Sequence, residues 1–151
     1  MKRYLVPLLA LFLAGCSGSA GTENIPDTET VCTELSALYD GEIVRQEKDD
    51  ICIFLNLEED MVAEAAGGWL EGAPEQFFYY VQCTDEKAAM DVKEAMDHYL
   101  TLMTDSAALY SPEQLELISN GYTAVKGTAA VVAVCEDADG IRLKITELFG
   151  N

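Results

Sequence analysis

The sequence predicts a single α+β domain over residues 28–151, in which a small, largely antiparallel sheet of three to four strands packs against helices. Three observations support this prediction. An aromatic run over 76–83 has the composition of a strand, the apolar residues of 85–104 recur at helical spacing, and two β-rich runs meet at Gly127. Beyond its first fifteen residues, the 151-residue chain is long enough for one ordinary core but not for two full domains.

Residues 1–15 have the order of a secretory signal peptide, because Lys2 and Arg3 precede an apolar stretch from Tyr4 to Gly15. As a helix this stretch would cover about 18 Å, too little to cross a hydrocarbon core of about 30 Å. The end of the stretch, Leu13-Ala14-Gly15-Cys16, resembles the lipobox of bacterial lipoproteins. The resemblance implies cleavage before Cys16 and a diacylglyceryl group on its sulfur; the alternative is an ordinary signal peptide with an incidental cysteine.

A lipidated Cys16 predicts a protein held at the extracytoplasmic face of the cell membrane. Each buried methylene contributes about 0.8 kcal/mol, and two acyl chains are enough for stable anchoring where one is marginal. Residues 16–27 are then expected to form a tether, because 17–22 consist mainly of Ser, Gly and Ala. The predicted contact with the membrane is therefore through acyl chains alone.

The negative charge of the chain limits the classes of partner that it is expected to bind. Loss of Lys2 and Arg3 leaves 27 acidic and seven basic residues, so the net charge falls from −18 to −20. Such a surface repels nucleic acid phosphates and anionic lipid head groups, which excludes nucleic acid as an expected partner. The charge fits a solvated exterior, or one that binds cations or a basic partner.

Four cysteines follow the leader: Cys32, Cys52, Cys83 and Cys135. None are spaced as a C-x-x-C pair, so neither a zinc site nor a thioredoxin-like centre is predicted. Buried thiols, structural disulfides and redox work all remain open at this point. If a bridge exists, Cys83 with Cys135 is the expected pair, since both fall on predicted strands.

The first half of the domain gives mixed signals. Asp27 can cap a helix that ends at Gly41 and whose apolar positions are Val31, Leu35 and Leu38. The apolar run 51–55 is expected to be a short strand or a buried turn. Asn56 with Glu59 resembles a capping box, so a short helix is expected up to Gly67-Gly68, followed by a loop over 69–74.

The second half of the domain gives clearer secondary-structure signals. Residues 76–83 predict a central strand because both faces are apolar. The helix expected over 85–104 carries an inward stripe of Ala88, Val92, Ala95, Tyr99 and Leu102. Ser111-Pro112-Glu113-Gln114 predicts a short helix up to Asn120-Gly121. A hairpin over 122–136 and a closing helix, capped by Asp137 or Asp139 and marked by Ile141, Ile145 and Leu148, complete the chain.

The region from about residue 50 to 149 resembles the family called domain of unknown function 4358. The resemblance rests on 74–81, the long helix, Tyr110-Ser111-Pro112-Glu113-Gln114, Val125-Lys126-Gly127 and the strand 131–136. It implies a lipoprotein of a Gram-positive bacterium, in agreement with the reading of Cys16. It implies no activity and no functional residues.

Few residues suggest chemistry. His98 is the only histidine and lies on the polar side of the long helix, so it is expected to be exposed rather than catalytic. With Gly140 at the sixth position of an EF-hand loop, Cys135 and Thr146 would occupy positions that need carboxylates, so no calcium site is predicted. No cofactor is expected.

Trp69, Phe78 and Tyr80 are the candidate recognition residues, with core packing as the competing interpretation. The leading functional hypothesis is a non-enzymatic, lipid-anchored module that binds an unknown protein or cell-wall ligand. The alternative is a cell-envelope hydrolase using paired carboxylates. A thiol-oxidation partner is a third possibility.

Overall fold

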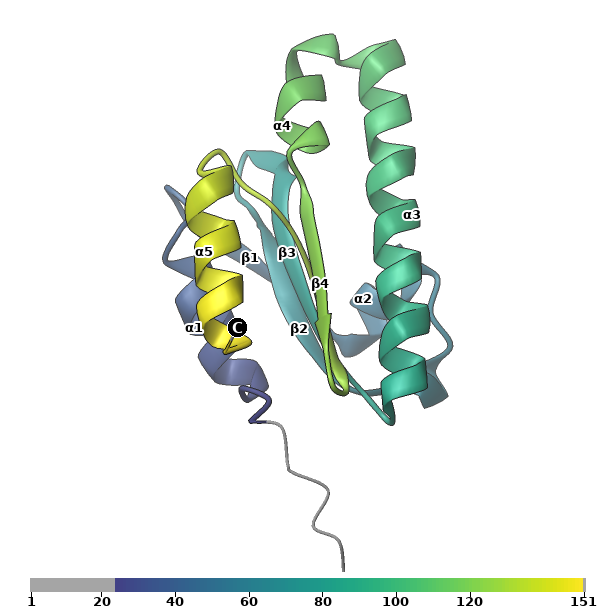
Figure 1. The fold of residues 1–151 in the computed structure, drawn as a ribbon. Helices are drawn as coiled ribbons and strands as arrows, with labels where there is room; N and C mark the ends of the chain where they lie inside the picture. Colours follow the sequence, from purple (N-terminus) through teal and green to yellow (C-terminus); the bar gives the residue numbers. More distant parts are fainter. Residues whose placement is uncertain (1–23, 151) are drawn as a thin grey trace, which may run out of the picture.

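A five-stranded antiparallel sheet with helices on both faces makes up residues 24–150, the part of the chain that the computed structural model describes (Figure 1). This confirms the predicted α+β class, although the sheet has more strands than expected. The helices and strands in chain order are α1 Thr28–Ser36, β1 Ile43–Glu47, α2 Lys48–Leu55, β2 Val62–Leu70, β3 Ala73–Cys83, α3 Glu86–Tyr110, α4 Leu115–Ser119, β4 Tyr122–Lys126, β5 Ala129–Val134 and α5 Ala138–Leu148. Two short 3-10 helices, η1 Glu59–Met61 and η2 Pro112–Gln114, precede β2 and α4.

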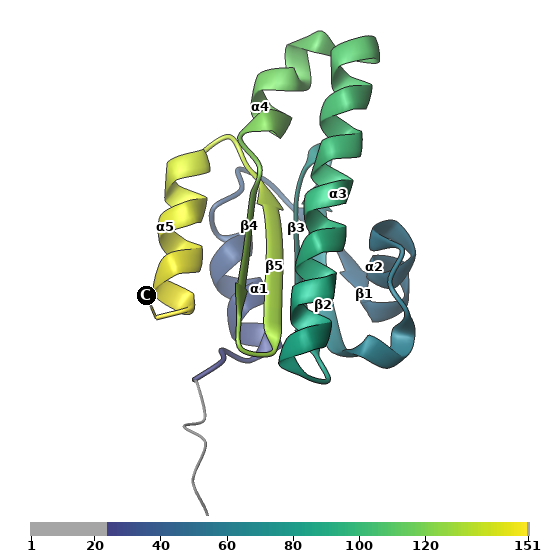
Figure 2. The same cartoon turned by 45° about the vertical axis from the view of Figure 1, so that its right-hand side comes forward.

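The strand order is β1-β2-β3-β5-β4, so the strand predicted over 76–83 is central, as expected. Side chains of a strand alternate between the two faces of the sheet. Phe77, Tyr79 and Val81 accordingly belong to one core, whereas Phe78 and Tyr80 belong to the other. Both cores are covered by helices, because α2 and α3 lie over the first face and α1 and α5 over the second (Figures 1 and 2).

Three helix starts lie where the sequence predicted them, each at an aspartate. Asp27 accepts a hydrogen bond from the Thr30 amide at 3.0 Å, and Asp85 accepts one from Ala88 at 2.8 Å. Asp137 accepts one from the Gly140 amide at 2.9 Å. These bonds satisfy amide groups that the first turn of a helix leaves without intrahelical partners.

The predictions for residues 51–74 are wrong. The run 51–55 lies in helix α2, and Asn56 ends that helix with a positive φ of 52° instead of starting a new one. The segment expected to be a short helix and a loop is strand β2, with Gly67 and Gly68 inside it. A Cβ at Gly67 would clash with the Phe78 carbonyl oxygen, and one at Gly68 with the Val44 carbonyl oxygen. The two glycines therefore permit close backbone approach within the sheet.

The N-terminal residues 25–27 belong to the folded domain. Ile25 packs against the core under α1 and α5, and the Pro26 carbonyl oxygen accepts hydrogen bonds from Tyr80 Oη at 2.7 Å and Gln82 Nε2 at 3.1 Å. The prediction that the tether includes residues 25–27 is therefore wrong. The predicted signal peptide 1–15, Cys16 and the rest of the tether lie outside the described residues. From 24 to 150, no helix has both the length and the apolarity needed to cross a membrane.

The four cysteines of the domain are free and buried. Cys83 ends β3, where its amide donates to the Thr128 carbonyl oxygen, whereas Cys135 follows the other end of β5. The seven residues from 128 to 135 span about 24 Å along a strand, and a disulfide needs Cα atoms within about 7 Å. The predicted bridge between Cys83 and Cys135 is therefore wrong. Burial raises the pKa of the Cys83 thiol to about 11, which matches the interpretation as buried thiols.

Candidate binding surface at the tip of the long helix

Helix α3 extends past the end of the sheet. Its 25 residues correspond to about 37 Å at a rise of 1.5 Å per residue. The neighbouring strand β4 has only five residues, or about 17 Å. The last turns of α3, together with η2 and α4, therefore form a helical hairpin that projects beyond the strands (Figures 1 and 2). This hairpin, residues 102–119, is called the helical tip.

The helical tip is at the end of the molecule opposite to the N-terminal residues 24–27 (Figure 1). Strand β3 runs from one of these ends to the other. Pro74, near its start, lines the hollow at the tip. Tyr80 and Gln82, near its end, donate hydrogen bonds to the Pro26 carbonyl oxygen. The end that carries residues 25–30 is called the N-terminal pole. Any attachment through the N-terminal residues therefore points the tip away from the point of attachment.

A hollow of about 370 Å³ lies between the tip and the sheet. Its lining combines apolar side chains with small polar ones: Pro74, Glu75, Met103, Ser106, Ala107, Ser111, Gln114 and Ile118. The volume is at the lower end of the range for sites that bind small molecules or single side chains. Ser106 and Ala107 lie three and four positions after Met103 on α3, so both share a face of the helix with it.

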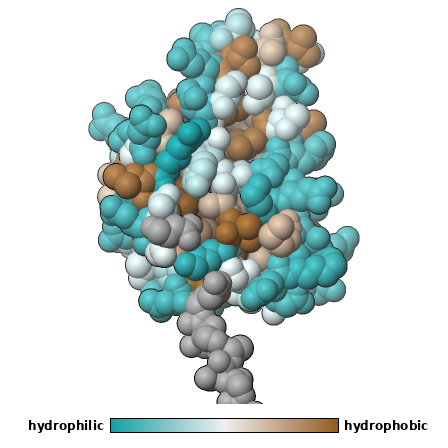
Figure 3. All heavy atoms as spheres, viewed as in Figure 1, coloured by the Kyte–Doolittle hydropathy of each residue, from teal (hydrophilic) through white to brown (hydrophobic). Residues whose placement is uncertain are grey.

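Large apolar side chains stand exposed beside the hollow. Leu102 is 53% exposed, Leu109 75% and Tyr110 81%. Tyr110 lies seven residues after Met103 and so continues the helix face that lines the hollow, while Leu102 and Leu109 form the adjacent stripe. Apolar side chains are visible over this upper part of the molecule in Figure 3. Exposed apolar side chains next to a hollow make this region a candidate interaction site.

The hollow and the three exposed residues together are called the tip surface, and its surroundings are acidic. Glu75 lines the hollow, and Asp105, Glu113 and Glu116 are exposed on the hairpin itself. The sequence has no Lys or Arg between Lys93 and Lys126. Glu113 and Glu116 line a separate hollow with Cys135, Glu136 and Ala138. The carboxylates beside the tip surface are therefore Glu75, in the hollow, and Asp105, which is three residues after Leu102 and four before Leu109 on α3.

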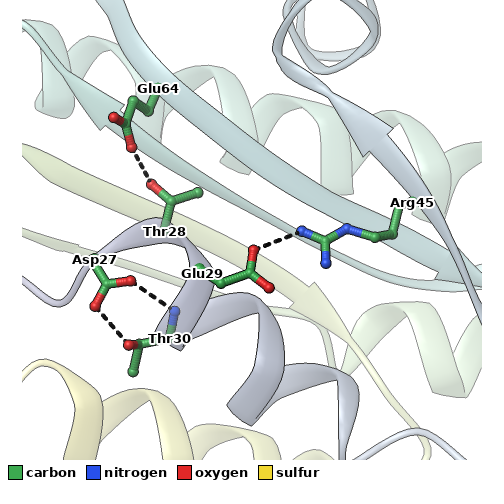
Figure 4. Close-up of polar contacts among 6 residues, drawn as sticks. All are labelled: Asp27, Thr28, Glu29, Thr30, Arg45 and Glu64. Atoms are coloured by element: carbon green, nitrogen blue, oxygen red, sulfur yellow. Dashed lines mark hydrogen bonds and ion pairs between the residues drawn. The ribbon is translucent and has the colours of Figure 1, made fainter.

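The N-terminal pole has a second hollow, of about 480 Å³, whose polar groups bind one another. In Figure 4, Thr28 Oγ1 donates to Glu64 at 2.8 Å and Arg45 pairs with Glu29 at 3.2 Å. Thr30 donates to Asp27 through its hydroxyl and its amide, and these bonds lower the pKa of the Asp27 carboxyl. Mutual pairing of this kind fixes the start of α1 on β1 and β2 and makes this hollow a structural feature.

The recognition surface predicted from Trp69, Phe78 and Tyr80 is wrong. Phe78 and Tyr80 are buried in the core under α1 and α5, where burial raises the pKa of Tyr80 to about 12. Trp69 lies on the opposite face of the sheet, half-buried, with its ring 5.9 Å from that of Phe54. The three side chains do not meet, because Trp69 packs under α2 and the other two under α1 and α5.

His98 is exposed on α3, as predicted. Beside it, Asp97 accepts hydrogen bonds from Lys93 at 2.6 Å and from Thr123 at 2.5 Å. Burial raises the pKa of Asp97, but these two bonds outweigh burial and lower it overall. A catalytic general acid needs a raised pKa, so Asp97 is suited to holding α3 on β4 rather than to proton transfer.

Sequence reasoning missed Leu109 and Tyr110, and placed Leu102 on the inward stripe of a helix ending at 104. One signal was available, because Leu102, Leu109 and Tyr110 continue the helical spacing up to the Ser111-Pro112 turn. What the spacing did not reveal is that the strands end before the helix does.

Comparison with known proteins gives no information on function, since no family model, no curated protein and no solved structure matches this chain. The resemblance to domain of unknown function 4358 stays a prediction.

Proposed function

We propose that this protein is a lipid-anchored, extracytoplasmic binding module that recognises a protein or cell-wall ligand with its tip surface. One observation carries the proposal: exposed apolar side chains and a hollow occur together at the end of the domain opposite to residues 24–27. A module tethered at one end can reach a partner most freely with the other end. The lipobox-like sequence at Cys16 supplies the proposed attachment.

The dimensions fit this arrangement. Nine residue steps separate Cys16 from Ile25, so the chain between them can span at most about 32 Å. The N-terminal pole would then stay within that distance of the membrane surface. The tip would lie farther out by the length of α3, about 37 Å. A negative charge of this size also favours a domain that stands off an anionic membrane.

The pKa values and positions of the carboxyl groups favour a binding function over a hydrolase. A glycosidase-type hydrolase needs two converging carboxyls, one with a raised pKa. Asp27 and Asp97 both have lowered pKa values, each because it accepts hydrogen bonds. The hollow at the tip is lined by one carboxyl, that of Glu75. We therefore place the function in recognition.

Attachment is tested by expressing the full chain in a Gram-positive host and measuring the intact mass of the protein extracted from membranes. The expected product begins at Cys16 and carries a diacylglyceryl group. Cys16→Ser is expected to prevent cleavage and lipidation. An unmodified N-terminus on wild-type protein, or wild-type protein recovered in the medium, would contradict the anchor.

Recognition is tested by placing a photo-cross-linking amino acid at Leu109 of the membrane-bound protein. The matched control is Leu143, which is 62% exposed on α5, away from the tip. The proposal expects a discrete adduct from position 109 and none from position 143. Equal adduct patterns at the two positions would contradict a binding role for the tip.

A further inference from the structure

We infer that the tip surface binds a basic amphipathic segment of a partner protein, with bulky apolar side chains on one side and Lys or Arg on the other. This inference rests on the proposed function, because it names the partner of the same surface. It combines three features of the described residues: a hollow, exposed apolar side chains next to it, and an acidic rim.

The apolar part of the surface is an exposed stripe on α3 next to the hollow. Leu102 and Leu109 are seven residues apart, which corresponds to about 10 Å along α3. Ser106 lines the hollow and is four residues after Leu102 and three before Leu109, so this stripe borders the hollow on α3. Amphipathic helices dock in hydrophobic grooves through apolar side chains at positions i, i+3 or i+4, and i+7. A partner helix of two to three turns would cover the exposed stripe.

The acidic residues near the tip surface favour a partner with positive charge. Residues 94–125 include five acidic residues and no Lys or Arg. Neither of the two rim carboxylates, Glu75 and Asp105, takes part in an ion pair between described residues. At the N-terminal pole, by contrast, Glu29 is paired with Arg45. The tip thus offers unpaired negative charge to an outside cation, and complementary charge steers association and excludes partners of the wrong sign.

Other occupants fit less well. An anionic head group or a nucleic acid would meet like charge. A second copy of the chain would bring the same acidic rim against itself, because a two-fold interface pairs identical patches. Within residues 24–150, no three His, Cys, Asp or Glu side chains are grouped so that they could hold a metal ion. A basic amphipathic helix satisfies both the apolar centre and the acidic rim.

The test uses the mature full-length protein in detergent and a fluorescent 14-residue helical peptide. The peptide has Leu at positions i, i+3, i+4 and i+7 and Lys elsewhere. We expect saturable one-to-one binding by fluorescence anisotropy, weakened at least fivefold between 50 and about 500 mM salt because charges are screened. The same peptide with Glu in place of Lys is expected not to bind.

Paired variants locate the site. Leu109→Ser with Tyr110→Ser is expected to weaken binding at least tenfold, as loss of central apolar anchors does, whereas Leu143→Ser leaves it within twofold. Glu75→Gln with Asp105→Asn is expected to weaken binding threefold or more and to reduce its salt dependence. The matched control, Glu58→Gln with Glu59→Gln near η1, keeps both. Unchanged thermal unfolding confirms that the exposed-site variants fold.

Three outcomes would overturn the inference: equal binding of the Lys and Glu peptides, equal losses in tip and control variants, or a concentration-dependent dimer that Leu109→Ser with Tyr110→Ser abolishes. The last result would assign the surface to a second copy. If the peptide fails to bind while cross-linking at Leu109 still gives a discrete adduct, the inference fails and the proposed function stands. If Cys16 is not lipidated, the peptide measurement is unaffected.

Discussion

The two ends of this molecule differ in how far their tyrosines are buried. Tyr80 is fully buried at the N-terminal pole, where its hydroxyl donates to the Pro26 carbonyl oxygen. Tyr110 is 81% exposed at the helical tip. The first stabilises the fold by filling a core and satisfying a backbone acceptor. The second leaves its ring in water, so it contributes little to the core and is free to contact the proposed partner.

The charged residues of the two ends differ in the same way. At the N-terminal pole, Glu29 pairs with Arg45, and Thr28 and Thr30 donate to carboxylates (Figure 4). At the tip, Glu113 and Glu116 are exposed on a stretch that has no basic residue. The charged groups at the N-terminal pole are therefore bound within the chain, whereas those at the tip face solvent.

The largest expected effect is the difference in stability loss between truncation of Tyr80 and truncation of Tyr110. Tyr80→Ala leaves a cavity in the core under α1 and α5 and should lower the free energy of unfolding by about 3–5 kcal/mol. Tyr110→Ala should change it by less than about 0.5 kcal/mol. Urea unfolding followed by circular dichroism measures both values. Similar losses in the two variants would break the distinction between the ends.

A smaller effect isolates the hydroxyl group of Tyr80. Tyr80→Phe keeps the ring and removes one of the two donors to the Pro26 carbonyl oxygen, since Gln82 Nε2 remains 3.1 Å away. The expected loss is about 0.5–1.5 kcal/mol, with faster hydrogen exchange at the start of α1. Exchange there at the wild-type rate would show that residues 25–27 are not held by this bond.

The smallest effect concerns acid stability. The pKa of Asp27 is lowered in the folded state, mainly by the Thr30 hydroxyl. Its contribution to stability is therefore fully present above the unfolded value of about 4 and is lost as the pH falls through the lower folded value. Thr30→Val should reduce the stability lost between pH 4 and pH 2. An acid unfolding curve as steep as that of the wild type would contradict this role.

The parts of the fold that the sequence predicted depend on local interactions. Asp27, Asp85 and Asp137 cap helices through residues three positions away, and this spacing is visible in the chain. Strands β1 and β2 were missed because their formation depends on distant partners. Gly67 and Gly68 resemble a helix stop in sequence, but their role is set by the carbonyl groups of Phe78 and Val44.

The candidate site could be predicted only in part, for a related reason. Whether Phe78 and Tyr80 are exposed depends on which faces of the sheet are covered, and helices cover both. Whether Leu102 and Leu109 are covered depends on where the strands end beside α3. Both properties arise from tertiary packing, whereas periodicity reports only which residues share a face.

The proposed function requires one orientation of the domain at the membrane, with the N-terminal pole near the lipid surface and the tip far from it. Energy transfer to an acceptor dye on vesicle lipids measures this directly, using donors on Glu86→Cys, at the start of α3, and Glu113→Cys, at the tip. The buried native thiols leave these introduced cysteines as the labelled sites. We predict clearly stronger transfer from position 86 than from position 113 in the lipidated protein. Equal transfer from both, or stronger transfer from position 113, would contradict the account.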